Sequence, residues 1–299
     1  MALMQRPAMI SSAIAMLFSS FSSPGAETLS YTGKARVGGE YQSNVNISAL
    51  EQASGKADTA RLLEAELSAS WQAGKKLKLD AGYSIQDKNY QQADDFNTRI
   101  QLAYLDASYQ LAKHSVGANI YYADATLDNA AFLTLNQASF YGMISGSDSW
   151  FIRPALTMAE KSFAQNVERN AETVTVSADS FWFSASGQRF LSVGIVWEDE
   201  NSRDNAFSYA APGVRVKVSN RFSLWHYQQQ LQLGARLSQR DYRATERSDT
   251  QTVIEASWQV NVNQHVALIG KAEHGNFSSS LDSADYRETR TALLFQLGF

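Results

Sequence analysis

The 299-residue sequence contains no cysteine, and this absence restricts both its chemistry and the ways in which it can be stabilised. Without cysteine the chain has no thiolate for catalysis or metal binding, and it cannot use the disulfides on which many small secreted domains depend. An N-terminus that is lipid-anchored through cysteine is excluded for the same reason.

Strong charge of either sign is also missing. The chain has 26 basic and 30 acidic side chains, so its formal net charge is −4. Proteins that bind nucleic acid through the phosphate backbone carry a basic surface, and this mild acidity gives no support for one. We therefore expect no nucleic-acid partner.

Long apolar runs are absent after the first 25 residues, so no transmembrane helix is expected. The N-terminus itself is typical of a secretion signal, with Arg6 before the apolar stretch 8–21 and a small residue for cleavage in Pro24-Gly25-Ala26. We predict a signal peptide over 1–26 and a single exported domain over 27–299. Such a domain is either soluble in the periplasm or a membrane-spanning β-barrel, whose strands expose only every second residue to lipid.

Alternation of apolar and polar residues favours the barrel. In 253–262 (VIEASWQVNV) and in 63–71 (LEAELSASW) every second residue is apolar, whereas a helix would repeat at three and four residues. Each run of this kind is long enough to cross a bilayer at a tilt, which takes roughly 9–11 residues. Fourteen runs are found: 31–43, 60–73, 77–89, 98–111, 115–126, 134–145, 149–161, 172–185, 189–201, 208–219, 228–242, 251–262, 265–276 and 285–299.

The connections between these runs alternate between short turns and longer polar loops, which is the pattern of outer-membrane barrels. Trp71, Trp150, Trp182, Trp225 and Trp258 all lie in or near short turns, as expected for an aromatic girdle at the periplasmic interface. The sequence therefore predicts a closed antiparallel transmembrane β-barrel of about fourteen strands, with both termini on the periplasmic side.

Two segments fit this pattern poorly. In 100–109 the apolar residues change parity after Tyr104, which predicts either a bulge or a role for Asp106 inside the barrel. The segment 220–227 is long for a turn on the periplasmic side.

On the inward parity the sequence places charges of both signs, so the predicted interior is polar. These residues either line an open pore, where segregated basic and acidic walls would set up a transverse field, or close the lumen through salt bridges. The predicted pore-lining residues are Lys34, Arg36, Glu40, Glu64, Glu66, Lys78, Asp80, Arg153, Arg215, Lys217, Arg236, Arg240, Glu255, Lys271 and Arg290.

Catalytic candidates are few. His114, His226 and His265 lie in or beside short turns, and His274 lies near the outer rim close to Ser278 but on the lipid-facing parity. The carboxylate pairs Glu64/Glu66 and Glu198/Glu200 face a wet interior, where acid–base catalysis lacks the water-poor pocket it needs, and Asp94/Asp95 lie in a loop. We expect no catalytic residues, no cofactor and no metal site, and a protein that is not an enzyme.

The stretch VGGEYQSNVN, 37–46, resembles the "G-x-x-Y-D-S-N-x-N" opening strand of the barrel in surface lipoprotein assembly modifiers. The last hairpin, NFSSS (276–280) followed by Asp285-Tyr286-Arg287, is also similar to that family's closing strands. The resemblance implies a fourteen-stranded barrel that helps to move lipoproteins or other exported cargo to the cell surface. The chain departs from the family at Gln42, where aspartate is usual, and in the expected absence of the family's periplasmic helical-repeat domain.

The sequence ends in ALLFQLGF, with Leu293, Phe295, Leu297 and Phe299 on the lipid-facing parity. Phe295, Leu297 and Phe299 resemble the signal that the barrel assembly machinery recognises in its clients. The expected location is the outer membrane of a Gram-negative bacterium. The expected partners are outer-membrane lipid, the assembly machinery, and a periplasmic or surface-exported protein.

Three functions stay open from sequence: a passage for exported cargo, a diffusion porin for small polar solutes, and a rim-site lipid hydrolase that would use His274.

Overall fold

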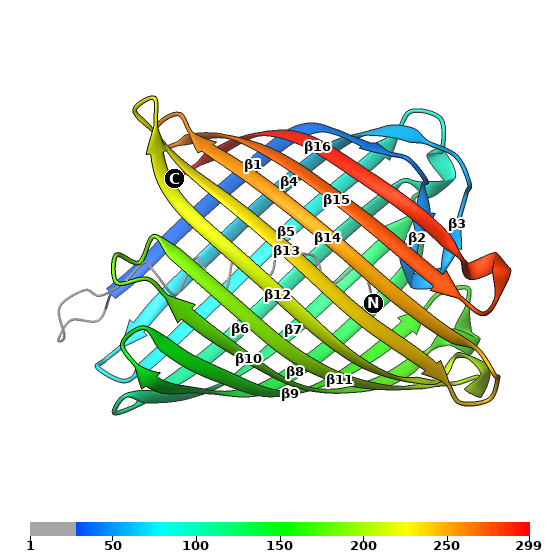
Figure 1. Cartoon of the computed structure of the whole chain (residues 1–299), viewed down its shortest axis with the longest axis horizontal. Helices are drawn as coiled ribbons and strands as arrows, with labels where there is room; N and C mark the ends of the chain where they lie inside the picture. The colour runs from blue at the N-terminus through cyan, green and yellow to red at the C-terminus, as the bar shows by residue number, and fades with distance from the viewer. Residues whose placement is uncertain (1–27) are drawn as a thin grey trace.

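The computed structural model describes residues 28–299, and these form a closed antiparallel β-barrel of fourteen strands (Figure 1). The predicted fold class is confirmed. The predicted signal peptide, 1–26, lies outside the described residues. No helix within residues 28–299 is long and apolar enough to cross a membrane. The barrel strands are β1 (Thr28–Gln42), β4 (Asp58–Ala73), β5 (Leu77–Tyr90), β6 (Thr98–Leu111), β7 (His114–Leu127), β8 (Ala130–Ser147), β9 (Trp150–Phe163), β10 (Ala171–Phe183), β11 (Arg189–Ser202), β12 (Tyr209–Leu224), β13 (Tyr227–Tyr242), β14 (Ser248–Asn261), β15 (Val266–Ser279) and β16 (Tyr286–Gly298).

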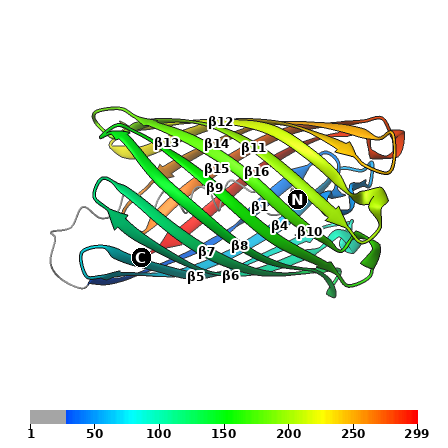
Figure 2. The ribbon, with the colours of Figure 1, turned by 90° about the horizontal axis from the view of Figure 1, so that it is seen from below.

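Each strand pairs with its neighbour in sequence, all strands tilt in the same sense (Figure 2), and β1 closes the ring against β16. The closing register runs from Lys34 opposite Gly298 to Gln42 opposite Arg290. Phe299 continues this pairing, because its N–H donates to the Gly33 carbonyl over 3.0 Å and its own carbonyl accepts from the Gly33 N–H over 3.1 Å. Closure pairs β1 with the last strand over residues 33–42, which satisfies the backbone groups of both strands there.

Turns lie at one end of the barrel and most of the longer loops at the other (Figure 1). The expectation of a long turn over 220–227 is wrong, because β12 extends to Leu224 and only Trp225 and His226 connect it to β13. Both residues have positive φ, 52° and 67°. Two successive residues of this kind make the hairpin turn whose twist matches that of the flanking strands. Asp128 and Asn129 join β7 to β8 in the same way at the other end, with φ of 47° and 61°.

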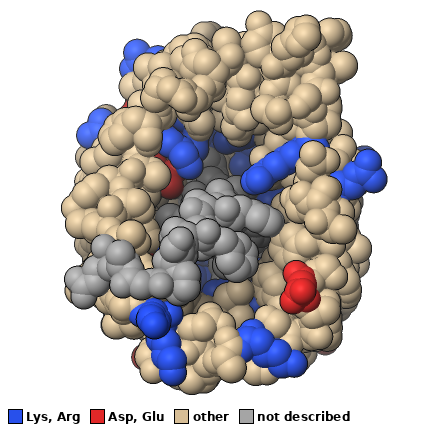
Figure 3. Space-filling model, turned by 90° about the vertical axis from the view of Figure 1, so that its left-hand side faces the viewer, with Lys and Arg blue, Asp and Glu red and all other residues tan. Residues whose placement is uncertain are grey.

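The short-turn end has a basic rim. Seen from that end, lysine and arginine side chains surround the opening and few acidic ones are in view (Figure 3). Exposed basic residues in or beside the short turns are Lys75, Lys76, Lys113, Arg189 and Arg221. Cations at the ends of membrane-spanning segments suit the interface, where lipid headgroups carry negative charge.

The pleat divides the side chains into an inward and an outward set, as the alternation predicts. Outward apolar residues such as Leu67, Ile195 and Ile254 are 58–61% exposed, which suits contact with lipid and not with water. Trp71 and Trp258 lie near the short-turn end and are also outward and exposed.

Strand β6 contains no bulge, so that prediction is wrong. Its pairing with β5 and β7 continues without a shift through Tyr104 and Leu105. The apolar residues before this point are inward, because Leu102 packs in a cluster inside the barrel and Tyr104 stacks on Tyr121. Asp106 is also inward and accepts hydrogen bonds from Tyr141 (2.8 Å) and Asn119 (3.2 Å), which is the alternative to a bulge that the sequence left open.

Candidate functional site

The barrel interior carries the charged side chains predicted from sequence, and the structure shows how they pair. Arg36 contacts Glu64 at 3.1 Å and Glu66 at 3.8 Å, and Lys78 contacts Asp80 at 2.9 Å. These contacts form between adjacent strands or along one strand, as the inward parity requires.

On the opposite wall, Arg215 binds Asp179 through two nitrogens at 2.6 and 2.7 Å, and Lys217 lies 3.7 Å from Glu255. Charges of opposite sign are therefore paired within each wall, which favours the salt-bridged interior over the segregated walls. The sequence shows the sign of each charge but not its cross-strand partner. Two further lysines outside the predicted set, Lys88 and Lys161, also join the interior network.

The other predicted interior residues have different surroundings. Glu40 pairs with Lys88, and Arg240 and Arg290 belong to the networks at the outer mouth and at the closing strands. Arg153 lies over the ring of Tyr141, 4.3 Å from its centre. Lys34 makes no side-chain ion pair or hydrogen bond with another of residues 28–299. Arg236 and Lys271 take inward positions on β13 and β15.

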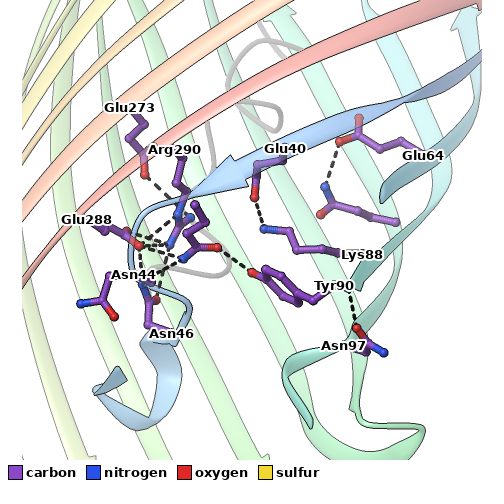
Figure 4. Close-up of polar contacts among 12 residues, drawn as sticks. Glu40, Asn44, Asn46, Glu64, Lys88, Tyr90, Asn97, Glu273, Glu288 and Arg290 are labelled. Carbon is purple, nitrogen blue, oxygen red and sulfur yellow. Dashed lines mark hydrogen bonds and ion pairs between the residues drawn. The ribbon is translucent and has the colours of Figure 1, made fainter. Parts of the chain in front are cut away.

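A polar network links the closing strands to the first loop (Figure 4). Glu288 on β16 accepts hydrogen bonds from Gln42 (2.9 Å), Arg290 (2.9 Å) and Asn46. The Tyr90 hydroxyl donates to the side-chain amide oxygen of Gln42. The Gln42 amide therefore donates to the Glu288 carboxylate and accepts from the Tyr90 hydroxyl. An aspartate at position 42 would place a second carboxylate beside Glu288, which gives a local reason for glutamine here.

Replacing Gln42 by the isosteric glutamate tests this network. The substituted side chain would lose the amide donor and place a carboxylate beside Glu288, and a buried unsatisfied or like-charged contact costs about 1–3 kcal/mol. We expect Gln42→Glu to lower the urea midpoint of the folded barrel at pH 7, with much of the loss recovered near pH 4. An unchanged urea midpoint at pH 7 would show that the hydrogen bonds of Gln42 do not stabilise the folded barrel.

The first loop, residues 43–57, lies across the outer mouth of the barrel. It contains β2 (Asn46–Ile47), a 3-10 turn (Ser48–Leu50) and β3 (Gln52–Ala53). Val45 packs near its own strands, against Ala60 and Tyr90. Ile47 packs much farther around the ring, with Phe132 on β8 and Phe163 on β9.

The tip of this loop is held by an arginine cluster. Glu51 contacts Arg240 of β13 (3.2 Å), Arg247 of the β13–β14 loop (3.0 Å) and Arg169 of the β9–β10 loop (3.7 Å). The Tyr242 hydroxyl also donates to Glu51. Burial raises the pKa of Glu51, but the arginines and the tyrosine outweigh that effect and hold it below its usual value of 4.5.

Loop 43–57 thus starts between β1 and β4 and contacts β8, β9 and β13, which lie on other sides of the ring. Sequence reasoning did not find this contact set. The available signal was the apolar run Ile47, Ala49 and Leu50 within a segment read as a polar loop.

The catalytic candidates are not assembled into a reactive site. His274 is outward and exposed, and its Nδ1 lies 2.9 Å from the Thr289 hydroxyl. Glu64 and Glu66 share Arg36, while Glu198 and Glu200 both accept from the Tyr209 hydroxyl. Among residues 28–299 no group of three histidine and carboxylate residues is placed to hold a metal ion.

The three residues of the predicted assembly signal lie on the outward face of the closing strand. Phe295, Leu297 and Phe299 are 39%, 50% and 77% exposed. The Phe299 ring covers Gly33, where a Cβ would lie 2.4 Å from the ring.

Solved structures place this architecture among outer-membrane barrels. The anion-selective porin from Comamonas acidovorans matches with a TM-score of 0.51 and 9% identity over 92% of this chain and 100% of that chain. OmpT of Vibrio cholerae, in its trimer form, matches with a TM-score of 0.55 and 7% identity over the same shares. A bacterial polysaccharide outer membrane secretin gives 0.50 and 10% over 89% and 97%. At these identities the likeness shows the fold alone.

A family model matches residues 35–267, which is most of the chain, so the protein belongs to the surface lipoprotein assembly modifier family. The family and the fold together make it an outer-membrane β-barrel. No curated protein matches it significantly.

Proposed function

We propose that the barrel is a passage in the outer membrane for exported cargo, and that surface lipoproteins are the class of cargo. The family match over residues 35–267 carries this proposal. The loop across the outer mouth supports a passage that is closed at rest, because an export route must not leak small solutes when no cargo is present.

The proposed gate is loop 43–57, and its latch is the contact of Glu51 with Arg169, Arg240 and Arg247. Cargo entering from the periplasmic end would displace the loop. The carboxylate of Glu51 and its three arginine partners would then be hydrated by water at the mouth. The barrel wall would stay intact, because its strands are joined through backbone pairing around the whole ring.

Surface labelling of whole cells tests the cargo class. Cells that lack the gene, and the same cells complemented with it, would be treated with a membrane-impermeant biotin reagent and compared by quantitative proteomics. In cells that lack the gene, we expect one or a few lipoproteins to lose their biotin label while their total amounts stay constant. Unchanged labelling of every lipoprotein would reject the proposed cargo class.

Complementation with His274→Ala distinguishes a passage from a rim hydrolase. Because the one side-chain hydrogen bond of His274 within residues 28–299 is with the Thr289 hydroxyl, we expect this variant to restore surface labelling fully and to leave lipid turnover unchanged. A loss of lipid turnover would instead show that the rim histidine is catalytic.

A further inference from the structure

A groove with a volume of about 610 Å³ crosses the lipid-facing side of the barrel wall. It runs from the closing strand β16 over β1, β4 and β5 to the loop end of β6 and β7. This volume falls within the range of small-molecule sites, which is about 300–1,000 Å³.

One end of the groove is apolar. Ala35 and Ala65 lie opposite each other on β1 and β4 and form a shallow floor. Val37, Leu63 and Leu297 lie beside that floor and are 41–50% exposed on the outer face. This part faces the hydrocarbon region and suits an acyl chain.

The other end is polar and lies at the loop ends of its strands. Asp87 on β5 accepts from Arg99 on β6 at 2.8 and 2.9 Å, and it also accepts from Asn89. The Arg99 side chain is 55% exposed. Asn97 lies at the same end.

Arg61 is a positively charged residue at this polar end that has no acidic partner among the described residues. It lies on the outward face of β4, opposite Asn89 in the register. It makes no side-chain ion pair or hydrogen bond with another of the described residues. A charge on the lipid face costs little near the interface, where headgroups supply its counter-charge.

The outward face of the groove therefore carries a net positive charge. Arg61 and Arg99 outnumber Asp87, which is the outward carboxylate of the lining. The lining also includes Arg36 and Glu64, but these two point into the barrel and pair with each other at 3.1 Å. A ligand of this groove should be anionic at its polar end.

We propose that this groove binds a phosphorylated, acylated glycolipid of the outer leaflet, of the lipid A type. One acyl chain lies along the alanine floor, and a headgroup phosphate pairs with Arg61 and Arg99. The amides of Asn89 and Asn97 donate to phosphate or sugar oxygens. The net positive charge selects this lipid over a neutral one.

On the far side of the barrel, Arg243 is paired directly with Asp199. It provides a matched control, because it is an exposed arginine outside the groove. Ala256 on β14 provides the control for the alanine floor, because it lies between the outward residues Ile254 and Trp258 and outside the groove.

The test uses the full-length barrel in phosphatidylcholine nanodiscs, with bis-phosphorylated lipid A and dephosphorylated lipid A as probes and native mass spectrometry as the readout. A phosphate–arginine contact is a charge-assisted pair, so we expect Arg61→Ala to weaken binding of the phosphorylated probe about tenfold. Arg61→Lys should retain most of the binding, and Ala65→Trp should abolish it by filling the groove. Arg243→Ala and Ala256→Trp should bind like the unmodified protein.

Three results with the lipid A probes would overturn the proposal. These are equal binding of the two probes, unchanged binding by Arg61→Ala, and equal losses in the groove and control variants. Binding of a triacylated lipopeptide that displaces lipid A and does not depend on Arg61 would also overturn it and assign the groove to a different lipid. Since the proposal depends only on the outer-membrane location, its failure would leave the proposed export function untouched.

Discussion

Replacing Gly38 by valine is expected to prevent formation of the folded barrel. Gly38 lies on β1 opposite Leu294 of the closing strand, and a Cβ built there would lie 2.0 Å from the Leu293 carbonyl oxygen. No side-chain rotation relieves a clash between a Cβ and the backbone, so the strands would have to separate where the barrel closes. Overpacking of this kind costs about 3 kcal/mol or more, which corresponds to about a 100-fold loss in the ratio of folded to unfolded chain.

Gly39 supplies the control for this prediction. It is the next residue on the same strand, but it points outward, and a Cβ there would approach only the Ala60 carbonyl, at 3.9 Å. Valine is favoured in strands, so Gly39→Val should fold like the unmodified protein. The readout is gel electrophoresis of outer-membrane preparations in detergent. The folded barrel migrates faster in unheated samples than in heated ones, so the fraction in the fast band gives the folded fraction. Normal folding of Gly38→Val would show that the closing register differs from the one described.

Removing the carboxylate of Glu51 is expected to open the outer mouth. The change leaves Arg169, Arg240 and Arg247 close together without their shared counter-ion. Breaking a buried ion pair by deleting one partner costs about 3–5 kcal/mol, so the ratio of open to closed loop should rise about 100-fold or more. Cells that express Glu51→Ala should become sensitive to large antibiotics, such as vancomycin, that the intact outer membrane excludes.

Asp94→Ala is the matched control, because Asp94 is an exposed loop acid that makes no ion pair with another described residue. It should leave antibiotic sensitivity unchanged. Sensitivity that is the same for Glu51→Ala and the unmodified protein would mean that Glu51 does not hold the loop. Deletion of residues 46–53 should produce at least the effect of Glu51→Ala, since it also removes the Ile47 contact.

The same contact should respond to acid. The pKa of Glu51 in the folded barrel is lower than its ordinary value of 4.5, so the stabilisation is complete above 4.5 and is lost as the pH falls through the lower, folded-state value. Arg247 also binds Asp249, at 2.5 Å, so it keeps one carboxylate partner when Glu51 is protonated. Conductance in planar bilayers should therefore rise on acidification below about pH 4.5, and Glu51→Gln should abolish this step. An identical acid response in Glu51→Gln would assign the step to other carboxylates.

The strand pattern could be predicted from the sequence because the two environments of a barrel wall impose a period of two on the side chains. Prediction failed where other interactions decide which face a residue takes. In β6, Ile100, Leu102 and Tyr104 are apolar yet inward. Ile100 packs against the cluster that holds Ile47 of loop 43–57, and Leu102 and Tyr104 pack in a second cluster inside the barrel.

The contacts that hold loop 43–57 at the outer mouth could not be predicted, because they join residues that are far apart in the sequence. Glu51 meets arginines at positions 169, 240 and 247, and nothing in the local sequence around any of them indicates that meeting. The individual partners of the interior charges could not be predicted for the same reason. The parity places Arg215 inward, but only the register brings Asp179 beside it.

A passage that its own first loop closes at rest should carry no current until that loop moves. Current recording of the unmodified protein in planar bilayers at pH 7 tests this most directly. We expect a silent membrane at low voltage, and steady channels when Glu51→Ala replaces the unmodified protein under the same conditions. Steady ohmic channels from the unmodified protein would contradict the closed passage and would indicate a diffusion porin.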